Sequence, residues 1–159
     1  MQRTNYLWHY SALPRLAAIM DSGFLKPGNV YAPGETPMLW FSANQHWENT
    51  ATKMVKGPSG LLMPLTFQQQ AKRFGCIRFG LPWDDLRILP WKAACSVAGT
   101  PREVRRSLEA SGKKIGGKSE DWFATSVTIG LEELHFQVWR DGWFDELISD
   151  CVKDRKSVV

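Results

Sequence analysis

The chain has 159 residues, of which 43% are hydrophobic and 23% are charged. This composition is ordinary for a globular protein and excludes an intrinsically disordered one. The formal net charge of +4 permits a polyanionic partner, although a solvated charged surface more often accounts for such a charge. No run approaches the roughly 18 apolar residues of a membrane span, and the first ten residues lack an apolar signal core. We therefore expect a cytoplasmic protein with no membrane partner.

The numbers and positions of cysteine and tryptophan narrow the possible classes of protein further. Cys76, Cys95 and Cys151 are scattered and form no CxxC pair, so neither a disulfide framework nor a zinc knuckle is predicted. Tryptophan is the compositional outlier, with eight copies, several of them beside polar or charged residues. Its ring offers a flat surface and one N–H donor, which suits stacking on a base as well as core packing.

The chain is expected to open with a strand and an amphipathic helix. Residues 6–10 (YLWHY) are short and aromatic, which is typical of a strand. The next apolar residues have the i, i+3, i+4, i+7 spacing of one helical stripe and are Leu13, Leu16, Ala17 and Met20. Ser11 is the expected N-cap of this helix, and Gly23 is its expected stop.

Loops and short strands are predicted to follow. Three prolines and two glycines predict a loop over residues 26–37, which is long enough to be a lid or a substrate-facing loop. Residues 38–42 (MLWFS) are predicted as a strand, after which the polar chain enters a helix near Trp47. A turn is expected at residues 57–60 (GPSG), and another strand is expected at residues 75–81 (GCIRFGL).

The second half is predicted to begin with a strand at residues 86–91 and to continue into a helix. Thr100 as the cap, Pro101 at the first helical position and Glu103 beyond them match a capping box. We expect that helix to end near Ala110 and to be followed by a mobile basic loop, KKIGGKSED.

The C-terminal third is predicted to be rich in strands. Residues 121–129 and 134–140 have β-rich compositions, and Asp141-Gly142 is typical of a hairpin turn. No repeat or linker interrupts the chain. The sequence therefore predicts one domain, residues 1–159, of the α+β class.

The sequence lacks the motifs of several common enzyme classes. The three histidines show no metal-ligand spacing, so no metal site is predicted. There is no GxSxG motif, no Cys–His signature and no glycine-rich phosphate loop. The remaining candidates for a functional site are His9 with Ser11, the aromatic second strand, and Glu132-Glu133 at the head of a late strand. Taken alone, His9 can also be a hydrogen-bonded core histidine, and the two glutamates can simply be solvated.

Four blocks in this order resemble a known superfamily. LWHYSALPRLAAIMDSGFLKP is similar to the opening of ADP-ribosyltransferases of the His–Tyr–Glu class, which includes diphtheria-type toxins and poly(ADP-ribose) polymerases. The next strand of that superfamily is similar to residues 37–51, PMLWFSANQHWENTA. A further core strand is expected where residues 74–81, FGCIRFGL, lie. The strand headed by the catalytic glutamate resembles residues 131–139, LEELHFQVW. The resemblance implies an ADP-ribosyltransferase-like split β-sheet with short flanking helices, and NAD as the substrate.

The resemblance also implies which residues hold NAD. His9 would bond a ribose hydroxyl or the adenosine side, through a neutral imidazole with one donor and one acceptor. The backbone of Tyr10, where the polymerases usually have glycine, would bind the nicotinamide amide. The Ser11 hydroxyl would add a further hydrogen bond to the nicotinamide amide. Ser42, at the end of the second strand, belongs to the same expected NAD-binding set.

A stacking ring and a carboxylate complete the expected site. The family places a tyrosine in or after the second block; here Trp47 is our choice for the ring that stacks on nicotinamide, and Tyr31 in the loop is the other candidate. A carboxylate beside the ribose 2′-hydroxyl would stabilise the oxocarbenium-like cation left by nicotinamide. Glu133 directly precedes the alternating strand and fits best, whereas Glu132 would face the opposite side and Glu146 is a third option.

The resemblance implies transfer of ADP-ribose to a macromolecular acceptor, either nucleic acid or protein, in a bacterial or phage toxin, effector or defence setting. A basic loop over residues 113–118 could lie along a phosphate backbone. Two other hypotheses stay open. One is a tRNA 2′-phosphotransferase-like enzyme, which would use arginines such as Arg73, Arg78 and Arg87. The other is a non-catalytic module whose tryptophans stack on nucleic acid or on a partner protein.

Overall fold

The structure is a computed structural model that describes residues 5–30 and 32–148. The strands are β1 (Tyr6–Ala12), β2 (Phe24–Leu25), β3 (Leu39–Ser42), β4 (Met54–Lys56), β5 (Leu62–Pro64), β6 (Cys76–Pro82), β7 (Leu89–Pro90), β8 (Trp122–Thr125), β9 (Ile129–Gly130), β10 (His135–Trp139) and β11 (Trp143–Asp145). The α-helices are α1 (Leu16–Ser22), α2 (Phe67–Arg73), α3 (Trp91–Ala98) and α4 (Arg102–Lys114). Single 3-10 turns lie at Leu13–Arg15, Asn49–Ala51, Ser119–Asp121 and Leu131–Glu133. The predicted α+β class is confirmed.

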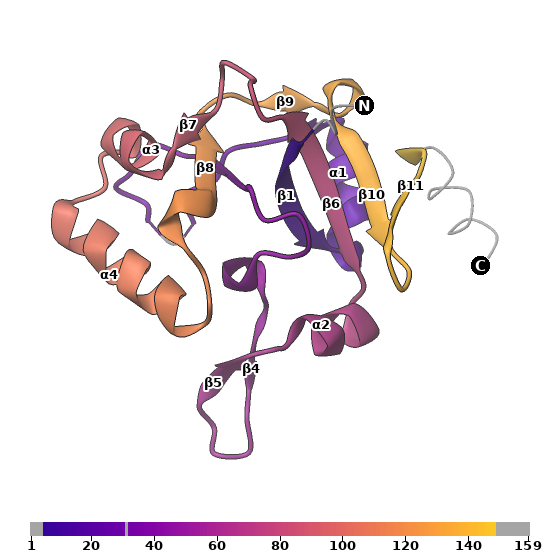
Figure 1. Ribbon diagram of the computed structural model, residues 1–159, viewed down its shortest axis with the longest axis horizontal. Helices are drawn as coiled ribbons and strands as arrows, with labels where there is room; N and C mark the ends of the chain where they lie inside the picture. Colours follow the sequence, from indigo (N-terminus) through magenta and orange to yellow (C-terminus); the bar gives the residue numbers. More distant parts are fainter. Residues whose placement is uncertain (1–4, 31, 149–159) are drawn as a thin grey trace.

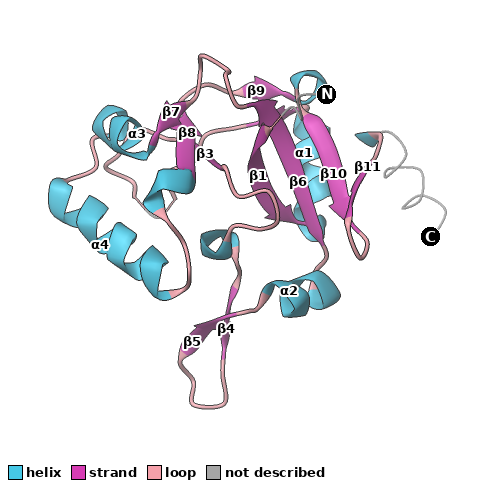
Figure 2. Cartoon of the chain, viewed as in Figure 1, coloured by secondary structure: helices cyan, strands magenta, loops and turns pink. Residues whose placement is uncertain are grey.

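A seven-stranded antiparallel sheet organises the molecule, in the order β11-β10-β6-β1-β3-β8-β7 (Figure 2). β1 pairs with β6 along its whole length, from Tyr6↔Pro82 to Ala12↔Cys76. In contrast, the recorded register between β1 and β3 is the single pair Trp8↔Ser42. The sheet therefore consists of two parts that are joined in the middle by one residue pair.

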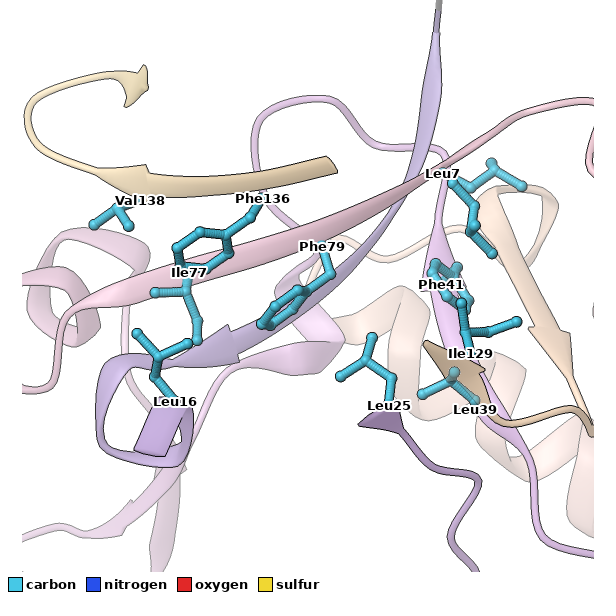
Figure 3. Packing of buried hydrophobic residues seen from close by; sticks show 11 residues of the cluster. Leu7, Leu16, Leu25, Leu39, Phe41, Ile77, Phe79, Ile129, Phe136 and Val138 are labelled. Carbon is cyan, nitrogen blue, oxygen red and sulfur yellow. The ribbon is translucent and has the colours of Figure 1, made fainter. Parts of the chain in front are cut away.

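One face of the sheet, called the apolar face below, carries the main hydrophobic core (Figure 3). Alternate residues of β6 point into it, because side chains of a strand alternate between its two faces. Helix α1 covers it through Leu16, and the small β2–β9 sheet adds further side chains. The buried members are Leu7, Leu16, Leu25, Leu39, Phe41, Ile77, Phe79, Leu81, Ile129, Phe136 and Val138. Burial of each such side chain stabilises the fold by roughly 1.5–3 kcal/mol.

The opposite face, called the aromatic face below, is built from rings and one arginine. Its buried members are Trp8, Tyr10, Trp47, Phe67 and Cys76, with Tyr6, Ala71, Trp139 and Trp143 packed against them. Arg78 of β6 lies among these rings. Helix α2 covers this face, whereas α3 and α4 lie over the other end of the sheet (Figure 1).

The first helix differs from its predicted start. Ser11 lies inside β1 and is not an N-cap; the chain first makes a 3-10 turn that contains Pro14, and α1 begins at Leu16 after Arg15. A proline has a fixed φ and no backbone donor, so it suits such a first turn. The predicted stop at Gly23 is confirmed, because this glycine adopts a left-handed φ of 75° and its N–H bonds back to the helix.

Helix α4 differs at both ends. It begins at Arg102 with Pro101 as its N-cap, and a proline side chain cannot make a capping bond. Thr100 lies one residue too early, and its N–H bonds to the carbonyl of Cys95 in the last turn of α3. It also continues past Ala110 to Lys114, so part of the expected basic loop is helical. A Cβ at Gly112 would lie 2.5 Å from the ring of Trp122. This close packing outweighs the roughly 1 kcal/mol that glycine costs inside a helix.

The other predicted elements are partly confirmed. Strands form within residues 38–42, 75–81, 121–129 and 134–140, and Asp141, with a φ of 54°, lies in the expected hairpin turn between β10 and β11.

In the middle of the chain one prediction is confirmed in part, one is wrong, and one segment has more structure than expected. The strand at residues 86–91 shrinks to Leu89–Pro90 because α3 begins at Trp91. The helix near Trp47 is only the 3-10 turn Asn49–Ala51. The GPSG turn joins the strands of a hairpin, β4–β5, and α2 follows it. Within the described residues, no helix combines the length and apolarity that a membrane crossing requires.

Candidate functional site

The sheet opens on one side of β1, just after the pair Trp8↔Ser42. The Leu13 N–H bonds to the Gly75 carbonyl, which places the backbone groups of odd-numbered β1 residues toward β6. Even-numbered residues therefore direct their N–H and C=O toward β3. Tyr10 and Ala12 lie beyond the last register pair recorded for the described part of β1 and β3, so their peptide groups face a gap in the ladder. We call this gap the sheet opening.

His9 explains why the ladder stops there. Its Nδ1 lies 2.8 Å from the carbonyl oxygen of Trp40, and Trp40 is the residue that a continued register would place opposite Tyr10. The imidazole thus occupies an acceptor that the ladder would otherwise use. Because a carbonyl only accepts, Nδ1 carries the hydrogen, and Nε2 is left as the acceptor of the neutral ring. No partner of Nε2 is recorded within the described residues.

The surroundings of His9 keep the ring neutral. The side chain is half-buried and lies edge-on to Phe41, with ring centroids 5.9 Å apart. Burial lowers the pKa of His9 below its ordinary value; the Trp40 carbonyl opposes this shift, and the positive charge of Arg15 adds to it. At neutral pH the ring therefore presents one acceptor atom and no charge.

Tyr10 and Ser11 sit on either side of the strand. The Tyr10 side chain points to the aromatic face, where its hydroxyl donates to the Asn44 carbonyl and accepts from Arg78. Burial raises the pKa of Tyr10 to about 12, with the nearby Arg78 opposing the shift. Ser11 is half-buried and, by strand alternation, shares the side of His9. The structure thus leaves the Tyr10 backbone, and not its phenol, for the sheet opening.

Ser42 and a buried glutamate hold the point at which the two parts of the sheet meet. The Ser42 hydroxyl donates to Glu48 Oε1 at 2.9 Å and accepts from the Asn44 N–H. The other oxygen of Glu48 accepts from the N–H and the hydroxyl of Thr50. Sequence analysis missed Glu48, which caps the 3-10 turn Asn49–Ala51; glutamate is not among the residues preferred as N-caps, so the sequence carried no clear signal for it. Both side chains are engaged in fixing the fold.

The expected stacking role of Trp47 does not agree with its position. Trp47 is 3% exposed, its ring stacks on Phe67 at 5.0 Å, and Tyr10 packs edge-on at 4.8 Å. Its indole N–H bonds to Thr52, so the side chain is a core element. The other candidate, Tyr31, lies outside the described residues.

Trp40 is the accessible ring beside the sheet opening. It is 37% exposed, and its register places it directly across the opening from Tyr10. Trp91 of α3 supports one side of the ring, with centroids 5.3 Å apart. Sequence reasoning could not choose Trp40 over its neighbours, because the choice depends on the register between β1 and β3.

Glu133 is not brought next to His9. The register links His9 to Phe79 and Phe79 to Phe136, so Glu133 lies three residues before the level of His9 and two strands away. Its carboxylate accepts from Arg87 at 2.9 Å and is exposed. The Arg87–Asp85 ion pair at 2.8 Å extends this cluster.

The two alternative glutamates line a separate cavity. Glu132 and Glu146 border a cavity of about 420 Å³ at the outer edge of the sheet, together with His135 and Asp145. His135 Nε2 and Asp145 Oδ1 are 2.6 Å apart there, and Arg140 pairs with Glu146. In the part of the chain that the structure describes, the recorded side-chain partners of His9 are Trp40, Phe41 and Arg15, so the choice among the three carboxylates remains a prediction.

The three arginines named for phosphate binding have different environments. Arg78 is buried between the rings of Trp8 and Trp143, at 3.8 and 4.3 Å, and donates to Gln137. Arg87 is held in ion pairs, whereas Arg73 of α2 is exposed. In the described ranges, no three His, Cys, Asp or Glu residues cluster in a way that could hold a metal ion.

Comparison of the chain with protein-family models, with curated proteins and with solved structures found no match.

Proposed function

We propose that this protein binds NAD at the sheet opening and transfers its ADP-ribose part to a macromolecular acceptor. The observation that carries the proposal is the end of the β1–β3 register at Trp8↔Ser42, beyond which the Tyr10 peptide groups face the sheet opening beside a neutral His9. A sheet joined by a single pair at β1 and β3 is also the feature expected of an ADP-ribosyltransferase-like split sheet.

The Tyr10 backbone is matched to a primary carboxamide. A residue in an antiparallel strand directs its N–H and C=O to the same side, and a neighbouring residue there would supply the complementary pair. The carboxamide of nicotinamide has an N–H donor and a C=O acceptor. It can therefore replace the missing strand partner at Tyr10. The exposed ring of Trp40 lies across the gap, where it supports stacking on the pyridine ring.

His9 supports the binding of a sugar hydroxyl. Its Nε2 is an acceptor because Nδ1–H is held by the Trp40 carbonyl. The lowered pKa of His9 keeps that acceptor available at neutral pH. Ser11, on the same side of β1, adds a hydroxyl that both donates and accepts. The two residues fit a ribose ring bound next to the amide.

The proposed reaction breaks the bond between ribose C1′ and the pyridine nitrogen. Nicotinamide leaves with the bonding electron pair and becomes neutral, and C1′ passes through an oxocarbenium-like state. The acceptor nucleophile then bonds to C1′ and loses a proton. A carboxylate near the ribose stabilises this transition state electrostatically. Glu133 is the proposed carboxylate, with Glu132 and Glu146 as alternatives.

The direct test is nicotinamide release from NAD by the purified protein, with and without a mixture of cellular protein, RNA and DNA. His9→Ala is expected to lower release by roughly 10²-fold, as the loss of one preorganised polar contact does. The matched control is His46→Ala, an exposed histidine on the aromatic face. Trp40→Ala is expected to weaken NAD binding, whereas Trp83→Ala, another exposed tryptophan, is not.

The carboxylate is assigned by three separate variants, Glu133→Gln, Glu132→Gln and Glu146→Gln. Only one of them is expected to lose release by roughly 10²-fold or more while NAD binding is kept. If the folded wild-type protein neither binds NAD calorimetrically nor releases nicotinamide with any acceptor, the transferase proposal fails. A non-catalytic binding module on this fold would then be the better account.

A further inference from the structure

The β4–β5 hairpin projects from the body of the molecule (Figure 1). Four of its large apolar side chains are more than half exposed, namely Met54, Leu61, Leu62 and Met63, whereas Val55 is half-buried. Pro58 lies in the turn that joins the two strands. The hairpin therefore presents an apolar tip to the surroundings.

The base of the hairpin is firmly attached. The Lys53 N–H donates to the side chain of Gln70 at 2.7 Å, and Gln70 is a buried residue of α2. The Leu65 N–H bonds to the Lys53 carbonyl and closes the two strands at their base. The Gly57 N–H bonds to the Leu61 carbonyl and closes the turn. The apolar tip is thus held out from the body by a defined set of bonds.

The hairpin and the segments that flank it form one of two basic stretches of the chain, the other being residues 102–118. Residues 49–83 contain no aspartate or glutamate but contain five basic residues: Lys53, Lys56, Lys72, Arg73 and Arg78. The rest of the chain has 20 − 5 = 15 basic and 16 acidic residues, a formal charge of −1. Arg78 is buried, whereas Lys56, Lys72 and Arg73 are exposed and Lys53 is half-buried. Excess charge of one sign on one surface favours a partner of the opposite sign.

We propose that this surface, formed by the β4–β5 hairpin with Lys72 and Arg73 of α2, docks duplex DNA. A two-stranded β-ribbon can lie in the minor groove of duplex DNA, where Leu, Met and Pro side chains can be wedged between base steps. The flanking lysines and Arg73 contact phosphates. The hairpin has no aromatic ring for stacking on single strands, and duplex RNA is recognised mostly through 2′-hydroxyl and phosphate contacts, which an apolar tip does not make.

If the protein transfers ADP-ribose, the docked DNA duplex is the acceptor, and in this respect the inference rests on the proposed function. The docking itself is measured without NAD. Failure of one proposal is therefore distinguishable from failure of the other, since nicotinamide release and duplex binding are separate readings.

The test is fluorescence anisotropy with a labelled 20-base-pair DNA duplex at about 50 and 200 mM salt. A variant in which all four surface cations become glutamine (Lys53, Lys56, Lys72 and Arg73) should bind at least about 10-fold more weakly. Its slope of log K against log salt should be up to about 3.6 smaller in magnitude, at roughly 0.9 for each of the four lost phosphate contacts. The matched control is Lys26→Gln with Lys92→Gln, two exposed lysines on other elements, and should change neither value.

A second variant, Leu61→Ser with Leu62→Ser, tests the wedge. It should weaken duplex binding by roughly 10-fold and leave the salt slope unchanged, because no phosphate contact is removed. Both variants change surface residues, so an unchanged melting temperature verifies their folding. The proposal is overturned if the duplex does not bind at 50 mM salt, or if single-stranded DNA or duplex RNA of the same sequence binds as tightly. It is also overturned if anionic phosphatidylserine vesicles bind the protein and DNA does not.

Discussion

The two faces of the central sheet differ in how they are held together, and neighbouring residues of β6 show this. Phe79 points into the apolar face, where its neighbours are side chains that only need to exclude water. Arg78 points into the aromatic face, where its guanidinium is stacked between two indole rings and makes hydrogen bonds in several directions. Hydrophobic burial is non-directional, whereas a buried cation depends on the position of each acceptor.

The acceptors of Arg78 come from elements far apart in the chain. They are the Gln137 side chain on β10, the Tyr10 hydroxyl on β1 and the Gln45 carbonyl after β3. The Gln137 amide in turn donates to Asp145 on β11. One guanidinium therefore connects four strands and a loop. The comparison implies that the aromatic face tolerates substitution less well than the apolar face.

The largest effect is expected from Arg78→Met. This change keeps an unbranched stem but leaves the Gln137, Tyr10 and Gln45 oxygens without their donor in a largely buried site. We expect a loss of about 3–5 kcal/mol in the free energy of unfolding. For a chain of this size that corresponds to a drop of about 10 °C in Tm. Urea unfolding followed by fluorescence measures it.

The matched control is Arg73→Met, which removes an exposed arginine on α2. It should change stability by less than about 0.5 kcal/mol, as surface substitutions usually do. If both variants lose the same stability, the guanidinium of Arg78 does not organise the aromatic face.

A smaller effect is expected from conservative changes on the two faces. Arg78→Lys keeps the charge but loses the planar fork and the stacking between Trp8 and Trp143, so it should cost about 2–3 kcal/mol. Ile77→Leu on the apolar face conserves volume and should cost less than about 1.5 kcal/mol. Denaturant midpoints of the two variants give the comparison directly. Equal losses would show that both faces are held by packing alone.

Tyr10→Phe should have a smaller effect again, about 1–2 kcal/mol, because it removes the donor to the Asn44 carbonyl and an acceptor of Arg78. Its effect should not add to that of Arg78→Met, since the two residues share one network. It should add to that of Ile77→Leu, which lies on the other face. A double-mutant cycle for each pair of variants measures the coupling.

Elements that depend on local patterns could be predicted from the sequence, whereas features that depend on contacts between distant residues could not. The strand of β6 and the turn at Asp141-Gly142 follow from local patterns, namely an apolar segment and a turn dipeptide. Helix α2 carries a visible capping box of Thr66 and Gln69 that was missed. Gly112 inside α4 could not be predicted, because the ring that it packs against is distant in sequence.

The candidate site shows the same limit. The resemblance singles out His9 and the backbone of Tyr10, and both lie at the sheet opening. The burial of Trp47, the exposure of Trp40 and the role of Glu48 depend on how β3 is placed against β1. That register is set by contacts over more than thirty residues of chain, such as His9 with the Trp40 carbonyl. Local spacing contains no signal for it.

His9 is the polar exception on the apolar side of β1, and it gives the smallest predicted effect. Its pKa in the folded protein lies below the ordinary value of 6.5, chiefly because of burial. As the pH falls below about 6.5, the unfolded chain takes up a proton that the folded protein does not. Stability should therefore decrease from pH 7.5 to pH 5, and level off once the folded ring also becomes protonated.

His9→Gln tests this prediction, because glutamine can still donate to the Trp40 carbonyl but does not titrate. The variant retains His46 and His135, so their contributions cancel when it is compared with wild type. The difference in urea midpoint between pH 7.5 and pH 5 should be smaller in the variant than in wild type. An equal difference would mean that His9 is protonated without penalty in the folded state. Its Nε2 would then not be a lasting acceptor at the sheet opening, which would remove one of the two supports for NAD binding there.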